Sequence, residues 1–149
     1  MKKAVVGTVP LIMALLIASC ATGRAANTRG KRVSIPDSLR GTGMEAVEEG
    51  NTASISFNAN ATTGYSWEYS FDEQEIVGET TNEYVSKKHP KGMVGCGGKQ
   101  LYVFKGLREG STTATFIYRR PWEESSTLYS IKVSLVVDNA GNITIADIR

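Results

Sequence analysis

The sequence predicts an all-β fold, an immunoglobulin-like antiparallel β-sandwich of seven or eight short strands. Three observations predict it: apolar and polar residues alternate with a period of two, turn-forming clusters separate these segments, and helical periodicity is scarce. Short strands of this number in about 120 residues are typical of the architecture. The Cys…Trp…Cys pattern of antibody domains is missing, so burial alone must hold the core.

The expected strands of the first half follow in order. Residues 32–36 (RVSIP) predict a short edge strand. Residues 53–58 alternate cleanly, with Ala53, Ile55 and Phe57 on one face. The polar turn chemistry of residues 60–64 leads into a strand that starts at Tyr65. Residues 76–85 predict a weaker strand, with a helical turn over residues 75–79 as the alternative.

The second half begins with a long polar, glycine-rich loop over residues 86–98. Strands are expected over residues 99–107 and 112–120, separated by a turn at residues 108–111. Residues 127–137 form the strongest predicted strand, which places Tyr129, Ile131, Val133, Leu135 and Val137 on one side. Residues 138–142 (DNAGN) are a hairpin signal, and the strand that follows, residues 143–148, is expected to cover a sheet edge.

The first 19 residues do not belong to this domain. Two lysines precede an apolar run over residues 4–18, which is typical of a secretory signal and shorter than the ~20 residues that span a bilayer. The ending Ile17-Ala18-Ser19-Cys20 resembles a bacterial lipoprotein cleavage site. That resemblance implies lipidation of Cys20 and anchoring in the cell envelope, at the outer membrane or cell surface. Ordinary cleavage nearby would instead give a secreted protein.

The domain organisation is therefore a lipoprotein-type signal peptide over residues 1–19, a flexible tether over residues 20–31 and the sandwich over residues 32–149. Removal of the signal removes Lys2 and Lys3 and no acid, which leaves 15 basic and 15 acidic residues. A net charge of zero provides no broad basic field for nucleic acid. With Cys20 lipidated, Cys96 is the only remaining thiol, so no internal disulfide forms. We expect a monomer.

A catalytic centre is not expected. The single His89 lies seven residues before Cys96, so a Cys–His nucleophile pair is conceivable, but the lysine-rich segment around His89 is typical of a solvated loop. One histidine and one cysteine do not fill the four-ligand shell of zinc. No phosphate-binding glycine motif joins a strand to a helix. We therefore expect no enzyme activity, metal or cofactor.

Three loops have unusual composition. They are NATTGY (residues 60–65), GCGG (residues 95–98) and RRPWEE (residues 119–124), the last with Arg-Pro-Trp at residues 120–122. Each also has a purely structural explanation: the first as a stable turn, the second as glycines that let a long loop bend, and the third as a tryptophan that packs on the core, as most tryptophans do.

In order and spacing these motifs resemble the chagasin-like family of cysteine-peptidase inhibitors, which carries Asn-Pro-Thr-Thr-Gly-Tyr/Phe, Gly-x-Gly-Gly and Arg-Pro-Trp on loops between strands. The resemblance covers roughly residues 47–137. It implies an immunoglobulin-like fold whose loops plug the active-site cleft of papain-like cysteine peptidases reversibly, with residues 60–65 in the centre. The implied contact residues are Asn60, Ala61, Thr62, Thr63, Gly64, Tyr65, Gly95, Cys96, Gly97, Gly98, Arg120, Pro121 and Trp122.

The chemistry of these residues suits such a role. The threonine hydroxyls can bond to a peptidase backbone, and the glycines let backbone approach backbone closely. Trp122 offers a large rigid apolar anchor whose position Pro121 restricts. Arg120 either pairs with acidic groups at the cleft rim or supports its own loop.

Two departures from the family pattern affect the expectation. Ala61 replaces the usual proline, which predicts weakened rather than abolished inhibition. Cys96 fills the variable position of the glycine cluster, either as a small side chain or as a redox-sensitive thiol. The alternative function is a non-inhibitory cell-surface β-sandwich that serves binding or assembly. The sequence leaves open whether a target peptidase is endogenous or foreign.

Overall fold

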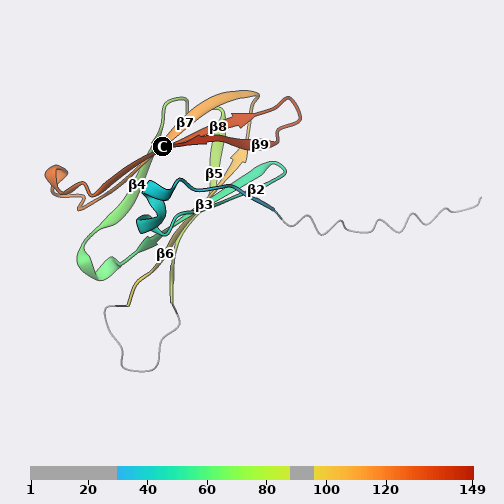
Figure 1. Cartoon of the computed structure of the whole chain (residues 1–149). Helices are drawn as coiled ribbons and strands as arrows, with labels where there is room; N and C mark the ends of the chain where they lie inside the picture. The colour runs from blue at the N-terminus through green and yellow to red at the C-terminus, as the bar shows by residue number, and fades with distance from the viewer. Residues whose placement is uncertain (1–29, 88–95) are drawn as a thin grey trace, which may run out of the picture.

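The protein is described by a computed structural model that covers residues 30–87 and 96–149 (Figure 1). In this part of the chain, antiparallel strands form two sheets, which confirms the predicted β-sandwich. The strands are β1 (Lys31–Arg32), β2 (Glu45–Glu49), β3 (Thr52–Ala59), β4 (Ser66–Phe71), β5 (Val77–Ser86), β6 (Gly98–Gly106), β7 (Gly110–Arg119), β8 (Tyr129–Val137) and β9 (Ile143–Ile148). Short 3-10 helices are η1 (Asp37–Thr42), η2 (Ala61–Thr63) and η3 (Glu124–Ser126).

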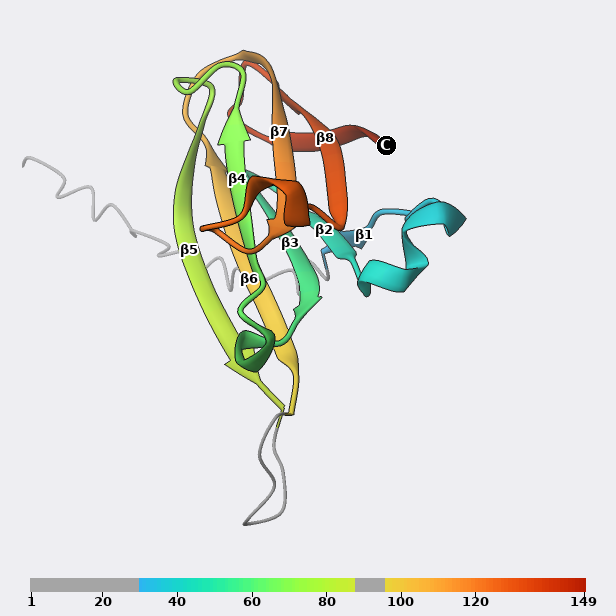
Figure 2. The ribbon, with the colours of Figure 1, turned by 90° about the vertical axis from the view of Figure 1, so that its left-hand side faces the viewer.

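One sheet has the strand order β1-β2-β3-β6-β5 and the other β4-β7-β8-β9. Strands β3, β5 and β7 end at the same pole of the sandwich at which β4, β6 and β8 begin. We call this pole the loop end and the opposite one the turn end. Loop 1 (residues 60–65) crosses between the sheets there, whereas loop 2 (between β5 and β6) and loop 3 (residues 120–128) each join neighbours within one sheet (Figure 2).

The alternating patterns of the sequence point into the space between the sheets, as predicted. Ala53, Ile55 and Phe57 of β3 are fully buried, and so are Ile131, Val133 and Leu135 of β8. Tyr129 shares their face but is 37% exposed, since it lies at the loop end. Phe57 stacks on Trp67 at 4.1 Å between ring centroids, so aromatic packing continues up to the base of the loops.

The one phenol at the centre of this core has a partner. The Tyr102 hydroxyl donates a hydrogen bond of 2.9 Å to the carbonyl oxygen of Trp67, which ties β6 to β4. Burial raises the pKa of Tyr102 to about 12, because the charged phenolate would lose its hydration, and the nearby Glu79 and Glu68 add to the effect. Tyr102 therefore stays neutral and donates at any physiological pH.

Two elements of the first half were not predicted. Strand β2 has the sequence EAVEE. Ala46 is its only buried residue, and the three glutamates leave too few apolar residues for a visible apolar–polar alternation. The 3-10 helix η1 has no apolar periodicity, and it ends at Gly43, whose φ of 62° lies in the left-handed region. The predicted edge strand over residues 32–36 is only partly correct, because β1 spans Lys31–Arg32 and pairs with β2.

Two further boundaries differ from the prediction. The helical turn considered over residues 75–79 is wrong, because β5 begins at Val77 and continues to Ser86. Gly98, expected in a loop, opens β6 and pairs with both Ala59 and Ser86. Its lack of a side chain allows this, as a Cβ there would lie 2.3 Å from the carbonyl oxygen of Val85.

The turn end is closed by backbone hydrogen bonds between separate turns. The amide of Ile143 donates to the carbonyl of Gly50 (2.9 Å), and that of Gly106 donates to Asn51 (3.0 Å). The predicted hairpin at residues 138–142 is confirmed, and β9 covers the edge of β8. A carboxylate oxygen of Glu48 in β2 accepts the amide of Ile145 at 2.7 Å, which joins the two sheets along this side.

Candidate functional site

Loop 1 is held by hydrogen bonds among its own short polar residues. Asn60 is extended, and its Oδ1 accepts from both the amide (3.2 Å) and the hydroxyl (2.8 Å) of Thr62. The hydroxyl of Thr63 donates to the carbonyl of Asn60 at 2.7 Å. Asparagine at this N-cap position satisfies amides that the single turn η2 leaves without partners. Both hydroxyl hydrogens are thus used within the loop, and each oxygen keeps capacity to accept.

Gly64 ends this turn and lies directly under loop 3. Its φ of 77° is in the region that only glycine adopts readily. A Cβ on Gly64 would lie 2.8 Å from Cη2 of Trp122, so the indole packs against the glycine backbone. Both the backbone conformation and the close contact therefore require a residue without a side chain.

The indole of Trp122 is 74% exposed, so the alternative in which Trp122 packs into the core is wrong. The neighbouring Arg120 places its guanidinium 4.8 Å from the ring centroid of Tyr65, a cation–π contact between loops 3 and 1. Arg120 also pairs with Glu123 at 3.4 Å. Of the two roles left open for Arg120, the structure shows internal support of the loops.

Loop 3 is further stabilised by a serine that sequence reasoning missed. The backbone amide of Arg120 donates to Oγ of Ser126 (2.9 Å), whose hydroxyl donates to the carbonyl of Glu123 (2.6 Å). The backbone amide of Glu123 donates a hydrogen bond of 3.0 Å to the carbonyl oxygen of Arg120. A serine three residues after Glu123, close behind the Arg-Pro-Trp motif, is the signal that could have indicated this local bond.

The role of Arg119 was also missed by sequence reasoning: this residue fixes the base of loop 3. Its guanidinium bonds Glu68 of β4 at 3.1 and 3.0 Å and lies 3.9 Å from Glu124. Only a quarter of the Arg119 side chain is exposed, so this pairing is better shielded from solvent than the other ion pairs of the loop end.

The described residues of loop 2 lie against the start of loop 1. A Cβ on Gly97 would lie 3.1 Å from the carbonyl oxygen of Ala59, so the two backbones are in close contact. Cys96 is a half-buried free thiol, and its redox sensitivity stays a prediction. Gly95, His89 and the expected lipidation site Cys20 lie outside the described residues.

The structure therefore brings loops 1 and 3 into direct contact through their side chains and places the described residues of loop 2 beside loop 1, all at the loop end. Pro121 is exposed beside Trp122, and Ala61, Thr62 and Thr63 are exposed in loop 1. Among residues 30–87 and 96–149, no three His, Cys, Asp or Glu side chains are grouped so that they could hold a metal ion.

No helix in the described ranges has the length and apolarity that crossing a membrane requires.

The sequence of this chain is similar to that of known proteins. Residues 46–137 match the sequence model of the chagasin family peptidase inhibitor I42. The chain is 34% identical to Amoebiasin-1 of Entamoeba histolytica over 91 residues, which covers 60% of this chain and 86% of the relative. It is 35% identical to Amoebiasin-2 of the same organism over 101 residues, with 60% and 80% covered.

A solved structure shows the same fold. The crystal structure of the cysteine protease inhibitor EhICP2 from Entamoeba histolytica superposes with a TM-score of 0.51 at 30% identity, covering 57% of this chain and 77% of that one. The resemblance read from the three motifs is thus confirmed, and so is the expectation that the protein is an inhibitor and not an enzyme. The family match spans more than half of the chain, and the protein belongs to the chagasin family of peptidase inhibitors.

Proposed function

We propose that this protein inhibits papain-like cysteine peptidases by inserting loops 1, 2 and 3 into the active-site cleft. Membership of the chagasin family and similarity to a cysteine protease inhibitor of known structure support the target class. The observation that carries the loop mechanism is the Trp122 indole, which is 74% exposed yet packed against Gly64 of loop 1. Two loops thereby form one projecting surface.

Pre-organisation supports this proposal. Loop 1 is fixed by the hydrogen bonds of Asn60, Thr62 and Thr63, and loop 3 by those of Ser126 and Arg120. Loops that are ordered before binding lose little conformational entropy when they bind. A specific interface buries about 800 Å² per partner, which a surface of three loops can provide.

The mechanism is occlusion of the cleft, with no bond to the peptidase sulfur. The exposed turn of residues 61–63 would enter the centre of the cleft, and backbone at Gly97 and the indole of Trp122 would contact its two walls. The oxygens of Thr62 and Thr63 would accept hydrogen bonds from peptidase amides, since their hydrogens are already used within loop 1. Such a complex dissociates without chemical change, so inhibition is reversible.

The test measures residual activity of papain and a cathepsin against increasing inhibitor. The inhibitor is the chain from residue 20 onward with Cys20→Ser, which removes the site of lipidation. We expect competitive inhibition of both enzymes, full recovery of activity on rapid dilution, and no effect on trypsin as a serine-peptidase control. A folded protein that inhibits neither cysteine peptidase would contradict the proposal and favour a non-inhibitory binding or assembly module.

We also propose that the protein is a monomer anchored in the cell envelope through lipid on Cys20. The signal-like residues 1–19 and the Ile17-Ala18-Ser19-Cys20 ending support this location. Metabolic labelling with a radioactive fatty acid should mark the wild-type protein and not Cys20→Ser. Membrane fractions that retain Cys20→Ser as well as the wild type would contradict the anchor.

A further inference from the structure

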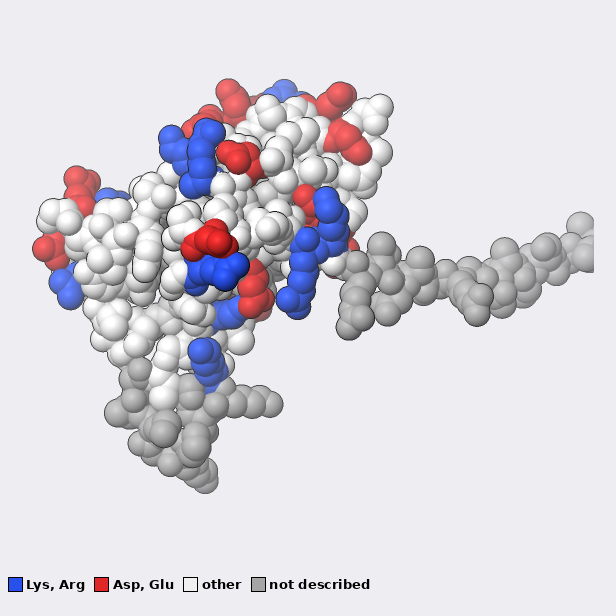
Figure 3. All heavy atoms as spheres, viewed as in Figure 1, with Lys and Arg blue, Asp and Glu red and all other residues white. Residues whose placement is uncertain are grey.

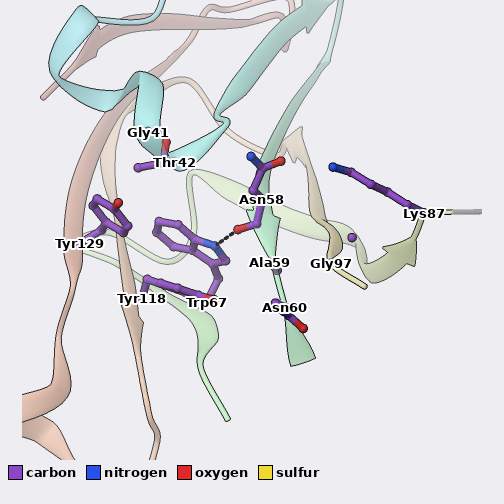
Figure 4. Close-up of a pocket in the computed structure, with 11 residues that line it drawn as sticks. Gly41, Thr42, Asn58, Ala59, Asn60, Trp67, Lys87, Gly97, Tyr118 and Tyr129 are labelled. Atoms are coloured by element: carbon purple, nitrogen blue, oxygen red, sulfur yellow. Dashed lines mark hydrogen bonds between the residues drawn. The ribbon is translucent and has the colours of Figure 1, made fainter. Parts of the chain in front are cut away.

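A hollow of about 300 Å³ opens at the loop end, between η1 and the stems of the three loops (Figure 4). It is bounded by Gly41 of η1, Asn58 at the end of β3, Lys87 and Gly97 of loop 2, and Tyr129 at the start of β8, with Trp67 beneath. Gly41 precedes residues 46–137, so η1 adds a wall from outside the segment that matches the family.

The base of the hollow is rigid. Trp67 is only 6% exposed and stacks on Tyr118 at 4.8 Å and on Tyr129 at 6.2 Å between ring centroids. Its indole Nε1 donates to the carbonyl oxygen of Asn58 at 3.0 Å (Figure 4). Because stacked aromatic rings and a bonded indole have little freedom, the base of the hollow is held in place by the protein itself.

The lining of the hollow carries a positive charge, and no acid among the described residues pairs with it. None of the residues that line it is Asp or Glu. The exposed Lys87 side chain extends back from loop 2 toward Asn58 (Figure 4), and it forms no ion pair with any residue in the described ranges. The nearby Lys99, by contrast, is paired with Glu45. The amide of Asn58 and the hydroxyl of Tyr129 add neutral hydrogen-bond donors at the rim.

We propose that this hollow receives an acidic side chain from the rim of the target peptidase's cleft, with Lys87 as its counter-ion. Asn60 and Gly97 belong both to the hollow and to the proposed inhibitory loops, so a peptidase seated on those loops lies against it. The inference rests on the proposed function and adds selectivity to it. Peptidases with a carboxylate at that rim position bind more tightly than those without one.

The first test reverses the charge of Lys87. Lys87→Glu is compared with Lys105→Glu, an equally exposed lysine of β6 at the turn end. Inhibition constants are measured for papain and a cathepsin at low and high salt. We expect Lys87→Glu to raise Ki at least about tenfold at low salt and Lys105→Glu to change it less than about twofold. A charge that contacts the peptidase affects binding more than a distant charge, which salt screens.

The second test fills the hollow without changing charge. A Cβ on Gly41 would lie 3.7 Å from the Tyr129 hydroxyl, an ordinary contact, so the first atom of a leucine side chain fits there, and the apolar atoms beyond it extend beside the hollow. Ser38→Leu, on an exposed position of η1, is the matched control. We expect Gly41→Leu to raise Ki about fivefold or more, as an occluded pocket loses its occupant. Equal melting temperatures verify that each pair is folded.

The outcomes separate this inference from the function on which it rests. If the wild type inhibits but Lys87→Glu equals Lys105→Glu on every peptidase inhibited, the acidic occupant is refuted and the inhibitory loops stand. If Gly41→Leu also equals Ser38→Leu, the hollow lies outside the interface. Failure of the wild type itself to inhibit would overturn the proposed function and this site with it.

Discussion

Gly50 and Gly141 at the turn end and Gly64 at the loop end are all turn-forming glycines, but they serve different purposes. At the turn end, Gly50 and Gly141 have φ of 57° and 83°, and a Cβ on either would meet nothing within 4 Å. At the loop end, Gly64 has a similar φ of 77°, but its missing Cβ is replaced by the indole of Trp122 at 2.8 Å. Gly50 and Gly141 thus serve only the backbone, whereas Gly64 serves both backbone and packing.

The exposed apolar residues differ in the same way. Leu107 at the turn end is 62% exposed and covers Gly78 of the adjacent strand, within one face of the sandwich. Trp122 is 74% exposed and joins two loops that have no sheet pairing with each other. An exposed side chain that connects separate loops shapes a surface, whereas one that covers its own sheet mainly protects it.

The largest expected effect comes from removal of these two side chains. Trp122→Ala should raise Ki for papain by a factor of about 30 or more, since a central tryptophan anchor is worth about 2 kcal/mol or more. Leu107→Ala, which removes another exposed apolar side chain but at the turn end, should leave Ki unchanged. Both variants should melt near the wild type. An unaltered Ki for Trp122→Ala would remove loop 3 from the interface.

The second comparison adds one methyl group at each end. Gly64→Ala and Gly141→Ala both force alanine into a left-handed conformation, which costs each about 1 kcal/mol of unfolding free energy. Only Gly64→Ala also displaces Trp122, so only this variant should weaken inhibition, by about tenfold. Denaturant titration measures the stability and a papain assay the inhibition. A similar Ki for Gly64→Ala and Gly141→Ala would mean that the position of the Trp122 indole does not affect inhibition.

A smaller effect is expected from the arginines. Arg120→Ala removes the cation–π contact with Tyr65 and should raise Ki about threefold, in line with about 0.5–1 kcal/mol for such contacts. Arg108 at the turn end pairs with Glu75 at 3.4 Å, and both side chains are mostly exposed. Arg108→Ala should alter neither Ki nor stability measurably. Equal inhibition by both alanine variants would show that loop 1 needs no support from Arg120.

The smallest effect is an improvement. Ala61 opens η2 directly after the extended Asn60 (φ −138°, ψ 98°), a position at which proline is well tolerated in a helical turn. Ala61→Pro should lower Ki about two- to fivefold, because a compatible proline contributes about 0.4–1 kcal/mol by restricting the free loop. A higher Ki would indicate that the proline ring clashes with the peptidase or with loop 1.

The sequence was sufficient for the sandwich and for the identity of the loops, because both depend on local patterns. The period-two runs of β3, β7 and β8 point to the core, and the Asn60 turn follows from side-chain bonds to its own backbone. Strand β2 and η1 could not be predicted from the sequence. Strand β2 is stabilised by its pairing with β3, and η1 has no repeating apolar face. Their formation depends on tertiary contacts.

The contacts between loops were equally beyond the sequence. The pairing of Gly64 with Trp122 and of Tyr65 with Arg120 joins positions more than fifty residues apart. The antiparallel pairing of β4 with β7, which sets Ser66 opposite Arg119, brings them together. For the same reason the role of Arg119, which bonds Glu68 of β4, could not be predicted before the fold was known. The sequence showed which residues were unusual, and the strand topology determined which of them are in contact.

The position of β1 has a consequence for how the protein would be displayed. Lys31 pairs with Glu48, next to the β2–β3 turn, so the described chain begins near the pole farthest from Trp122 (Figure 1). Nine residues separate Lys31 from Ala21, and a chain segment of ten such steps can extend at most about 35 Å. If lipid is attached at Cys20, the domain is anchored near its turn end, and its loop end faces away from the membrane. Enzymes arriving from the surrounding fluid would then meet the loops first.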